Sequence, residues 1–169
     1  TMALAQTMRN LENVRAQREA KSQLVDVFAH KFFALSPRLE FGEDLRPDLE
    51  EILAILEQQL ETDPGNRALL DEHARALHEL GNLEQARGDQ AAAEKRFERA
   101  YAITFELVES DPTDIGAATH LSTLCAKLGE ARRDQGDLEG RDRWFQRALE
   151  IDEGLVAKYP DDPELREDL

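Results

Sequence analysis

The fold is decided by residues 80–112, LGNLEQARGDQAAAEKRFERAYAITFELVESDP, because residues 128–160 repeat their pattern in register, LGEARRDQGDLEGRDRWFQRALEIDEGLVAKYP. The offset between the two stretches is 48 residues, and the same offset separates Pro64, Pro112 and Pro160. A fixed period of roughly 20 to 50 residues is typical of a solenoid, in which each unit buries its apolar face against its neighbours. We therefore expect a repeat array.

Each repeat is expected to contain two helices of about 20 residues. Asn66 and Asp114 lie two residues after a repeat proline, where a short polar side chain can cap a first helix. Gly88 is expected to end that helix in the left-handed conformation, and Asp89 to cap the second helix. The expected apolar stripes are Leu69, Leu70, His73, Leu77 and Leu80, then Ala93, Phe97, Ala100, Ile103 and Leu107, with Phe145, Ala148, Ile151 and Leu155 as a copy.

Small and aromatic residues recur at characteristic positions of the unit: Leu80-Gly81, Gly88-Asp89, Ala93, Phe97 and Ala100. This pattern resembles the tetratricopeptide repeat (TPR) family, in which small residues let two helices approach and an aromatic side chain fills the gap. The second copy departs at Arg141, where the family has a small residue. The resemblance implies an all-α fold, an antiparallel helix-pair solenoid that forms a right-handed superhelix. The long period is similar to a variety found in large bacterial signalling proteins.

The repeats are expected to cover residues 43–169, with a helix before Pro64 as the second half of an earlier unit and the last unit truncated. Residues 1–42 are expected to form a long N-terminal helix and a degenerate first helix pair. Because Pro160 opens another repeat that the sequence does not complete, the chain is interpreted as part of a longer protein.

Composition excludes several classes of function. The formal net charge of −15 argues against a nucleic-acid partner, because phosphate binding needs clustered Lys and Arg. No apolar run approaches the roughly 20 residues that span a bilayer, so direct membrane insertion is not expected. Cys125 is the only cysteine, which fits a reducing cytosol, and a cytoplasmic location is predicted.

The sequence carries no pattern that indicates catalysis. His73 and His78 are five residues apart and diverge around a helix, while His30 and His120 lie in other units, so no metal site is predicted. Cys125 occupies the position of Leu77 in the preceding unit, and a buried thiol usually behaves as a small hydrophobe. No phosphate-binding glycine loop is present. We therefore expect neither an enzyme nor a cofactor.

The TPR resemblance implies that a protein or peptide binds in a groove formed by the first helix of each pair. Asn82 falls where groove members of the family carry an asparagine that can bond a ligand's backbone, and Arg75 and Arg133 offer donors for a carboxylate. The groove residues predicted from the repeat alignment are Arg75, His78, Asn82, Gln85, Thr123, Ala126, Glu130 and Arg133.

A second interpretation assigns the chain a structural role. Residues 14–28 look similar to the charged helix that joins a bacterial serine/threonine kinase to a TPR tail. The N-terminal helix would then pair with its copy to form a homo-oligomer, and the repeats would space the other domains of a larger signalling protein. The binding interpretation is the leading one, and the structural role is its alternative.

Overall fold

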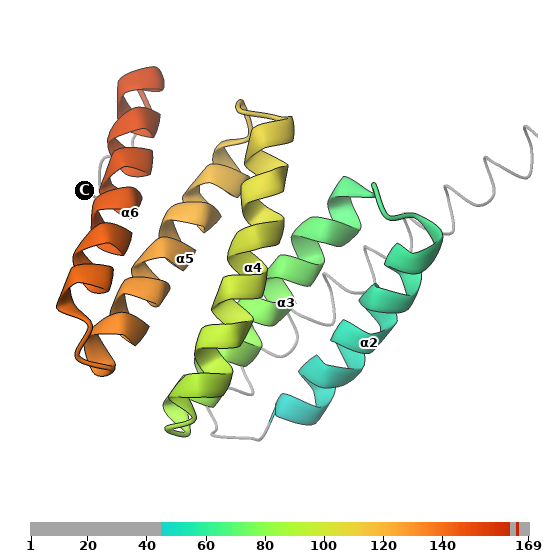
Figure 1. Ribbon diagram of the computed structural model, residues 1–169. Coiled ribbons are helices and arrows are strands. Elements are labelled where there is room, and N and C mark those ends of the chain that lie inside the picture. Colours follow the sequence, from blue (N-terminus) through green and yellow to red (C-terminus); the bar gives the residue numbers. More distant parts are fainter. Residues whose placement is uncertain (1–44, 163–164, 166–169) are drawn as a thin grey trace, which may run out of the picture. The chain divides into compact units, whose positions relative to one another are not determined.

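The computed structural model describes residues 45–162 and Leu165, and every regular element within them is a helix (Figure 1). The predicted N-terminal helix and first helix pair, residues 1–42, lie outside the described residues. The helices belong to one compact unit. In chain order they are α2 (Arg46–Thr62), α3 (Arg67–Ala86), α4 (Gln90–Ser110), α5 (Ile115–Asp134) and α6 (Leu138–Lys158).

The helices begin where the sequence places their caps. The side chain of Asn66 accepts a hydrogen bond from the Leu69 N–H at 3.2 Å, and that of Asp114 accepts one from Ala117 at 2.9 Å. These bonds satisfy N–H groups that have no partner within the helix. Asp89 caps α4 in the same way, through the Ala92 N–H. The predicted helix starts are therefore confirmed.

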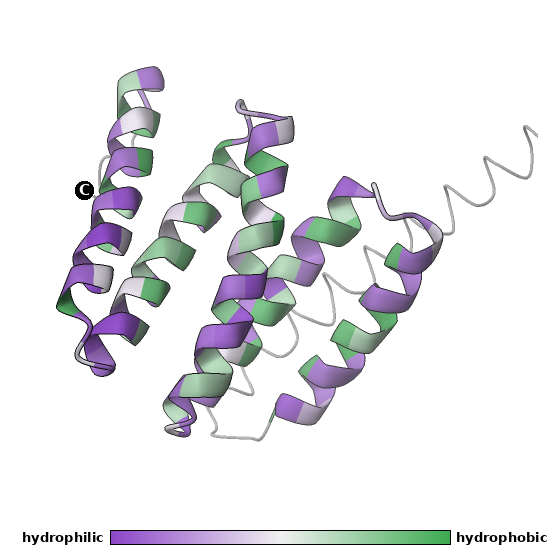
Figure 2. Ribbon diagram, in the orientation of Figure 1, coloured by the Kyte–Doolittle hydropathy of each residue, from purple (hydrophilic) through white to green (hydrophobic). Residues whose placement is uncertain are grey.

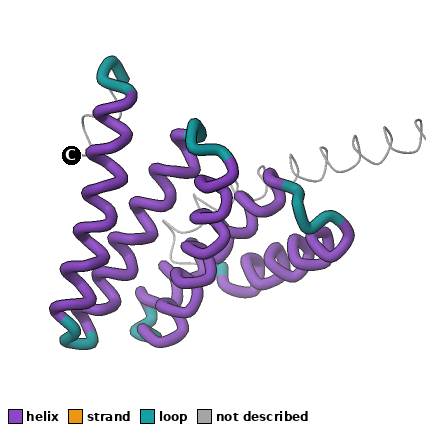
Figure 3. The backbone as a smooth tube through the Cα atoms, turned by 45° about the horizontal axis from the view of Figure 1, so that its top comes forward, coloured by secondary structure: helices purple, strands orange, loops and turns teal. Residues whose placement is uncertain are grey.

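A glycine follows the C-cap residue of the first helix of each pair. Gly88 has a φ of 85° and Gly136 a φ of 79°, a conformation that costs a residue with a Cβ atom free energy. The Gly88 N–H donates to the Gln85 carbonyl and the Asp89 N–H to the Glu84 carbonyl, both at 2.9 Å. This pair of bonds satisfies the last carbonyls of α3. The connections between helices are consequently short (Figure 3).

Each helix packs on its neighbours in sequence: α2 on α3, α3 on α4, α4 on α5 and α5 on α6. All five carry both apolar and polar residues along their length (Figure 2). The predicted stripe of α4 is largely buried, with Phe97 at 0% exposure, but Ile103 is only half-buried and Thr104 is buried in its place. Residue 104 lies seven positions after Phe97, which is two turns of helix, so it shares the face of Phe97 more closely than residue 103 does.

Phe97 and Phe145 contact a glycine of the preceding helix, but their surroundings differ. A Cβ atom on Gly81 would lie 2.6 Å from Cε1 of Phe97, and one on Gly129 would lie 2.7 Å from Cε1 of Phe145. The ring of Phe97 is fully buried, whereas Phe145 is 37% exposed. Phe145 therefore lies against the glycine that corresponds to the partner of Phe97, but it is less buried than Phe97. α5 covers α4, whereas after α6 the structure describes only residues 159–162 and Leu165.

Gly81→Ala is expected to destabilise the protein by about 1 to 2 kcal/mol, because overpacking costs about 1 to 3 kcal/mol and the better helix propensity of alanine returns about 1 kcal/mol. The buried Phe97 ring has no room to move away from the new methyl group. Gly129→Ala is expected to change stability little, since the exposed Phe145 ring can swing toward solvent. Urea denaturation of both variants checks this, and a larger loss for Gly129→Ala would contradict it.

Arg67 joins the two repeats. Its guanidinium donates to the Leu107 carbonyl at 2.8 Å, to the Ser110 hydroxyl at 2.8 Å and to the Asp114 carboxylate at 2.6 Å. The hydrogen bond from Arg67, followed by the backbone bond from Ala117, holds the pKa of Asp114 below its usual value. One side chain of α3 thus contacts the end of α4 and the cap of α5.

Candidate partner-binding surface

The predicted groove residues of α3 lie at steps of three and four along that helix. Arg75 is exposed and its Nε lies 3.0 Å from Oδ2 of Asp71, an ion pair within one turn. Asn82 is half-buried and its amide donates to Oε2 of Glu79 at 3.4 Å. Gln85 is half-buried near the end of the helix. Local partners therefore already engage Arg75 and the amide nitrogen of Asn82.

His78 of α3 contacts His120 of α5. Nδ1 of His78 lies 3.2 Å from Nε2 of His120, and the ring centroids are 5.2 Å apart with an angle of 27° between the planes. The ring of Phe97 approaches His78 edge-on, at a centroid distance of 5.9 Å. His120 is 8% exposed. Two neutral imidazoles suit this geometry, since one ring nitrogen donates and the other accepts.

Burial lowers the pKa of both histidines. Desolvation lowers the pKa of His120 to about 3, with further contributions from His78 and Arg75. Desolvation also lowers the pKa of His78, opposed by Glu79 and assisted by Lys127 and Arg75. Burial disfavours the charged imidazolium, and nearby cations add to this effect. The pair is therefore neutral at pH 7, although it lies among charged side chains.

Asn82 also leaves a polar atom unsatisfied. Its Oδ1 is buried, and the structure gives that atom no hydrogen-bond partner among the described residues. A buried acceptor such as this oxygen, without a partner, costs free energy that a ligand donor can recover.

On α5, Nζ of Lys127 lies 3.4 Å from Oε2 of Glu130. We call the following set the His-pair surface: Arg75, His78 and Asn82 of α3 with His120, Lys127 and Glu130 of α5.

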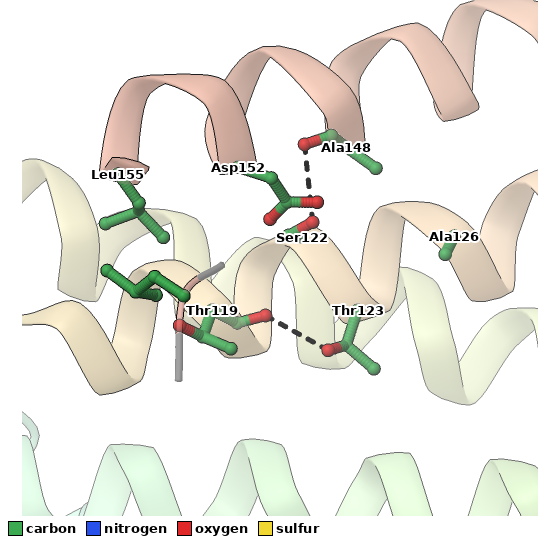
Figure 4. A pocket seen from close by; sticks show the side chains of 8 residues that line it. Thr119, Ser122, Thr123, Ala126, Ala148, Asp152 and Leu155 are labelled. Atoms are coloured by element: carbon green, nitrogen blue, oxygen red, sulfur yellow. Dashed lines mark hydrogen bonds between the residues drawn. The ribbon is translucent and has the colours of Figure 1, made fainter. Parts of the chain in front are cut away.

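The remaining predicted residues of α5 lie elsewhere. Thr123 donates its hydroxyl to the Thr119 carbonyl at 3.0 Å, and with Ala126 it lines a pocket between α5 and α6 (Figure 4). Nε of Arg133 lies 3.2 Å from Oδ1 of Asp134. The eight predicted residues are thus divided between the His-pair surface, the α5–α6 pocket and the ends of the two helices.

Sequence reasoning missed His120 as a member of the surface. A repeat of 48 residues aligns His120 with Glu72, so the alignment alone does not pair it with His78. The contact depends on how α5 crosses α3, and no local pattern reports that angle. The nearest signal in the sequence is that His78 and His120 both lie on the first helix of a pair.

No protein-family model matches the chain, and no curated protein or solved structure matches it. None of the helices in the described part of the chain is long and apolar enough to cross a membrane. In the same part, no group of three or more His, Cys, Asp and Glu side chains is arranged to hold a metal ion.

Cys125 is buried in α5, and burial raises the pKa of its thiol to about 11. A thiol with so high a pKa is almost entirely protonated at pH 7, and the thiolate is the nucleophilic form. The predicted place of Cys125 in the buried stripe, at the position of Leu77, is confirmed, since both residues are 0% exposed.

Proposed function

We propose that the chain is a TPR-like array, an antiparallel helix-pair solenoid with the right-handed superhelical twist of that family. The support is that two successive helix pairs, α3–α4 and α5–α6, share their caps, their left-handed glycines and a glycine-to-phenylalanine contact at the same 48-residue spacing. Such agreement at several independent positions is expected of stacked copies of one unit.

We further propose that the array is a protein-interaction scaffold that binds a peptide or partner protein at the His-pair surface. The observation that carries this proposal is the buried, unpartnered Oδ1 of Asn82 beside the contact between two successive repeats. Because Asn82 as a whole is only half-buried, rotation of its amide would bring that oxygen to the surface, where a backbone N–H of an extended peptide can donate to it. Arg75 and Lys127 are the cationic donors of this surface, and a ligand carboxylate would bind them by replacing their acidic partners Asp71 and Glu130.

Asn82→Ala is expected to weaken binding of a partner by about tenfold, because it removes one hydrogen bond to a buried acceptor, worth about 1 to 1.5 kcal/mol. The partner is first captured with the 169-residue chain from an extract of the source organism and then titrated by calorimetry. Arg133→Ala, whose side chain pairs with Asp134, is expected to have a smaller effect. Equal affinities for the wild type and both variants would place binding elsewhere, for example on the N-terminal segment.

The control for this titration is Glu106→Ala. Glu94, which lies outside the predicted apolar stripe of the same helix, does not serve as a neutral control. Oε1 of Glu94 lies 2.8 Å from Arg132 and Oε2 accepts from Gln135 at 2.5 Å, so Glu94 helps to join α4 to α5. Glu106 is exposed and lies nine positions from Phe97, which places it on the opposite side of α4.

A further inference from the structure

The two histidines of the His-pair surface meet in a geometry that suits a shared metal ion. Nδ1 of His78 and Nε2 of His120 are 3.2 Å apart, and the ring centroids are 5.2 Å apart. Two Zn–N bonds of about 2.0 to 2.1 Å at a tetrahedral angle place the nitrogens about 3.3 to 3.4 Å apart and the ring centres about 5.1 to 5.3 Å apart. Both observed distances therefore agree with tetrahedral coordination by the two rings.

A straight hydrogen bond between the two rings agrees less well with these distances. If the N–H of one ring pointed directly at the nitrogen of the other, the ring centres would be about 5.5 Å apart at the observed separation of the nitrogens. The observed centroid distance of 5.2 Å is shorter. At least one ring is therefore turned away from the line that joins the two nitrogens, as shared coordination of a metal ion requires.

The state of the two rings at pH 7 also suits coordination. Imidazole binds a metal ion in its neutral form, and burial lowers the pKa of both His78 and His120. Metal binding therefore needs no net loss of a proton, because the proton between the rings only moves to the far nitrogen of its own ring. His78 is half-buried, whereas His120 is 8% exposed, so a metal ion reaches the pair from the side of His78.

The far nitrogens of the pair have a suitable acceptor nearby. Nε2 of His78, Nδ1 of His120 and Oδ1 of Asn82 are buried and have no hydrogen-bond partner among the described residues. A histidine that binds a metal ion usually donates its other N–H to a carboxylate, a carbonyl or water. Asn82 follows His78 by four residues and so lies on the same face of α3. A small rotation of its amide would let Oδ1 accept the N–H of His78.

The charges around the pair do not oppose a cation. Arg75 lies 3.0 Å from the carboxylate of Asp71, and Lys127 lies 3.4 Å from that of Glu130. Glu79 adds a third carboxylate, whose charge acts on His78. Three carboxylates and two cations leave these surroundings with a net negative charge, in a chain whose formal net charge is −15. A divalent ion therefore meets a favourable local potential.

We propose that His78 and His120 are the two protein ligands of an open binding site for a divalent transition-metal ion, with Zn²⁺ as the best fit. Imidazole suits Zn²⁺, and tetrahedral coordination is the usual geometry of that ion. The described residues bring no third His, Cys, Asp or Glu ligand to the pair, so the other two coordination positions are left to water or to a group of a partner. The site goes beyond the function proposed above, because metal binding is measured without any partner.

Isothermal titration calorimetry with the full 169-residue chain, stripped of metal ions with EDTA, tests the site at pH 7. One saturable site for Zn²⁺ is expected. His78→Gln and His120→Gln are each expected to weaken binding by more than about 100-fold, because the loss of an outer partner of a ligand alone costs about 10- to 100-fold. Asn82→Ala removes such an outer partner and is expected to weaken binding by about tenfold.

Two controls distinguish the pair from general binding to an acidic chain. His73→Gln changes another buried histidine of α3, whose Nε2 lies 3.6 Å from Oε1 of Glu57, and is expected to leave the affinity unchanged. Excess Mg²⁺ is expected not to compete, because Mg²⁺ prefers carboxylate and water oxygens to imidazole. No binding of Zn²⁺, displacement by Mg²⁺, or equal affinity for the wild type and His120→Gln overturns the proposal.

A second measurement needs no substitution in the pair, in case the glutamine variants do not fold by circular dichroism. In ¹⁵N spectra of the wild type, one equivalent of Zn²⁺ is expected to shift the ring nitrogens of two histidines together, and contacts between their ring protons identify them as His78 and His120. A shift of one histidine alone, or of none, overturns the proposal. A dimer that forms in light scattering only with Zn²⁺ would assign the metal to a contact between copies and also overturn it.

Discussion

Phe97→Ala is expected to lower the free energy of unfolding by about 3 to 5 kcal/mol, because truncating a buried Phe removes its transfer free energy and leaves a cavity. The Phe97 side chain is fully buried, lies against Gly81 of α3 and contacts His78 at its edge. The neighbouring backbone cannot easily collapse into the cavity, since α3 and α5 both depend on α4 for their packing. A loss of this size is a large share of the total stability of a domain, about 5 to 15 kcal/mol.

Chemical denaturation of Phe97→Ala beside Phe145→Ala provides a matched comparison within one chain. Phe145 occupies the same position of the next repeat but is 37% exposed, so its truncation is expected to cost less than half as much. The exposed residue Glu106 serves as the neutral control when it is changed to alanine. If the denaturation curves of the two phenylalanine variants had the same midpoint and slope, the deeper burial of Phe97 would add nothing to the stability of the protein.

Acidification from pH 7 to pH 5 is expected to remove about 2 kcal/mol of stability through His120 alone. The folded-state pKa of this histidine is about 3, whereas the unfolded value is about 6.5. Between these two values the unfolded chain binds more protons than the folded chain, so stability falls as the pH is lowered below 6.5. Well above pH 6.5 both states are neutral and the contribution is constant. The lowered pKa of His78 acts in the same direction.

The measurement is urea denaturation of the wild type and of His120→Gln at pH 7 and pH 5. Glutamine keeps a polar side chain that can bond Nδ1 of His78 but does not titrate. The many carboxylates affect both proteins alike and mostly remain ionised at pH 5. His120→Gln is therefore expected to lose about 2 kcal/mol less than the wild type over this range. Equal losses would show that His120 is not held neutral by the fold.

The helix boundaries could be predicted because their causes are local. Asp89 and Asp114 each cap a helix through a hydrogen bond within three residues, and the left-handed Gly88 ends α3 in its own turn. Such signals need only the neighbouring sequence. The burial of Phe97 was also predicted, because the period aligns it with the apolar stripe of its own helix.

The parts of the surface that were not predicted depend on distance in space rather than in sequence. The contact between His78 and His120 joins helices that are not consecutive, and the engagement of Glu94 by Arg132 joins α4 to the far end of α5. Both contacts depend on the angles at which the helices cross. The packing of side-chain ridges into grooves determines such angles only to within about 20°. A stripe pattern shows which face of a helix is buried, but it does not show which side chain of another helix lies opposite.

Arg67 has a consequence for how the array responds to disturbance. Its guanidinium holds the last turn of α4 and the cap of α5 from the first turn of α3, and its counterpart 48 residues later is Ile115, which has no charge. In an array whose stability is a sum of units and junctions, successive pairs are therefore held by different polar bonds, since at the end of α6 Lys158 and Tyr159 donate to the Pro112 and Thr113 carbonyls before α5. Local opening at Asp114 releases Arg67 as well, so a perturbation at the start of α5 is transmitted directly to the start of α3.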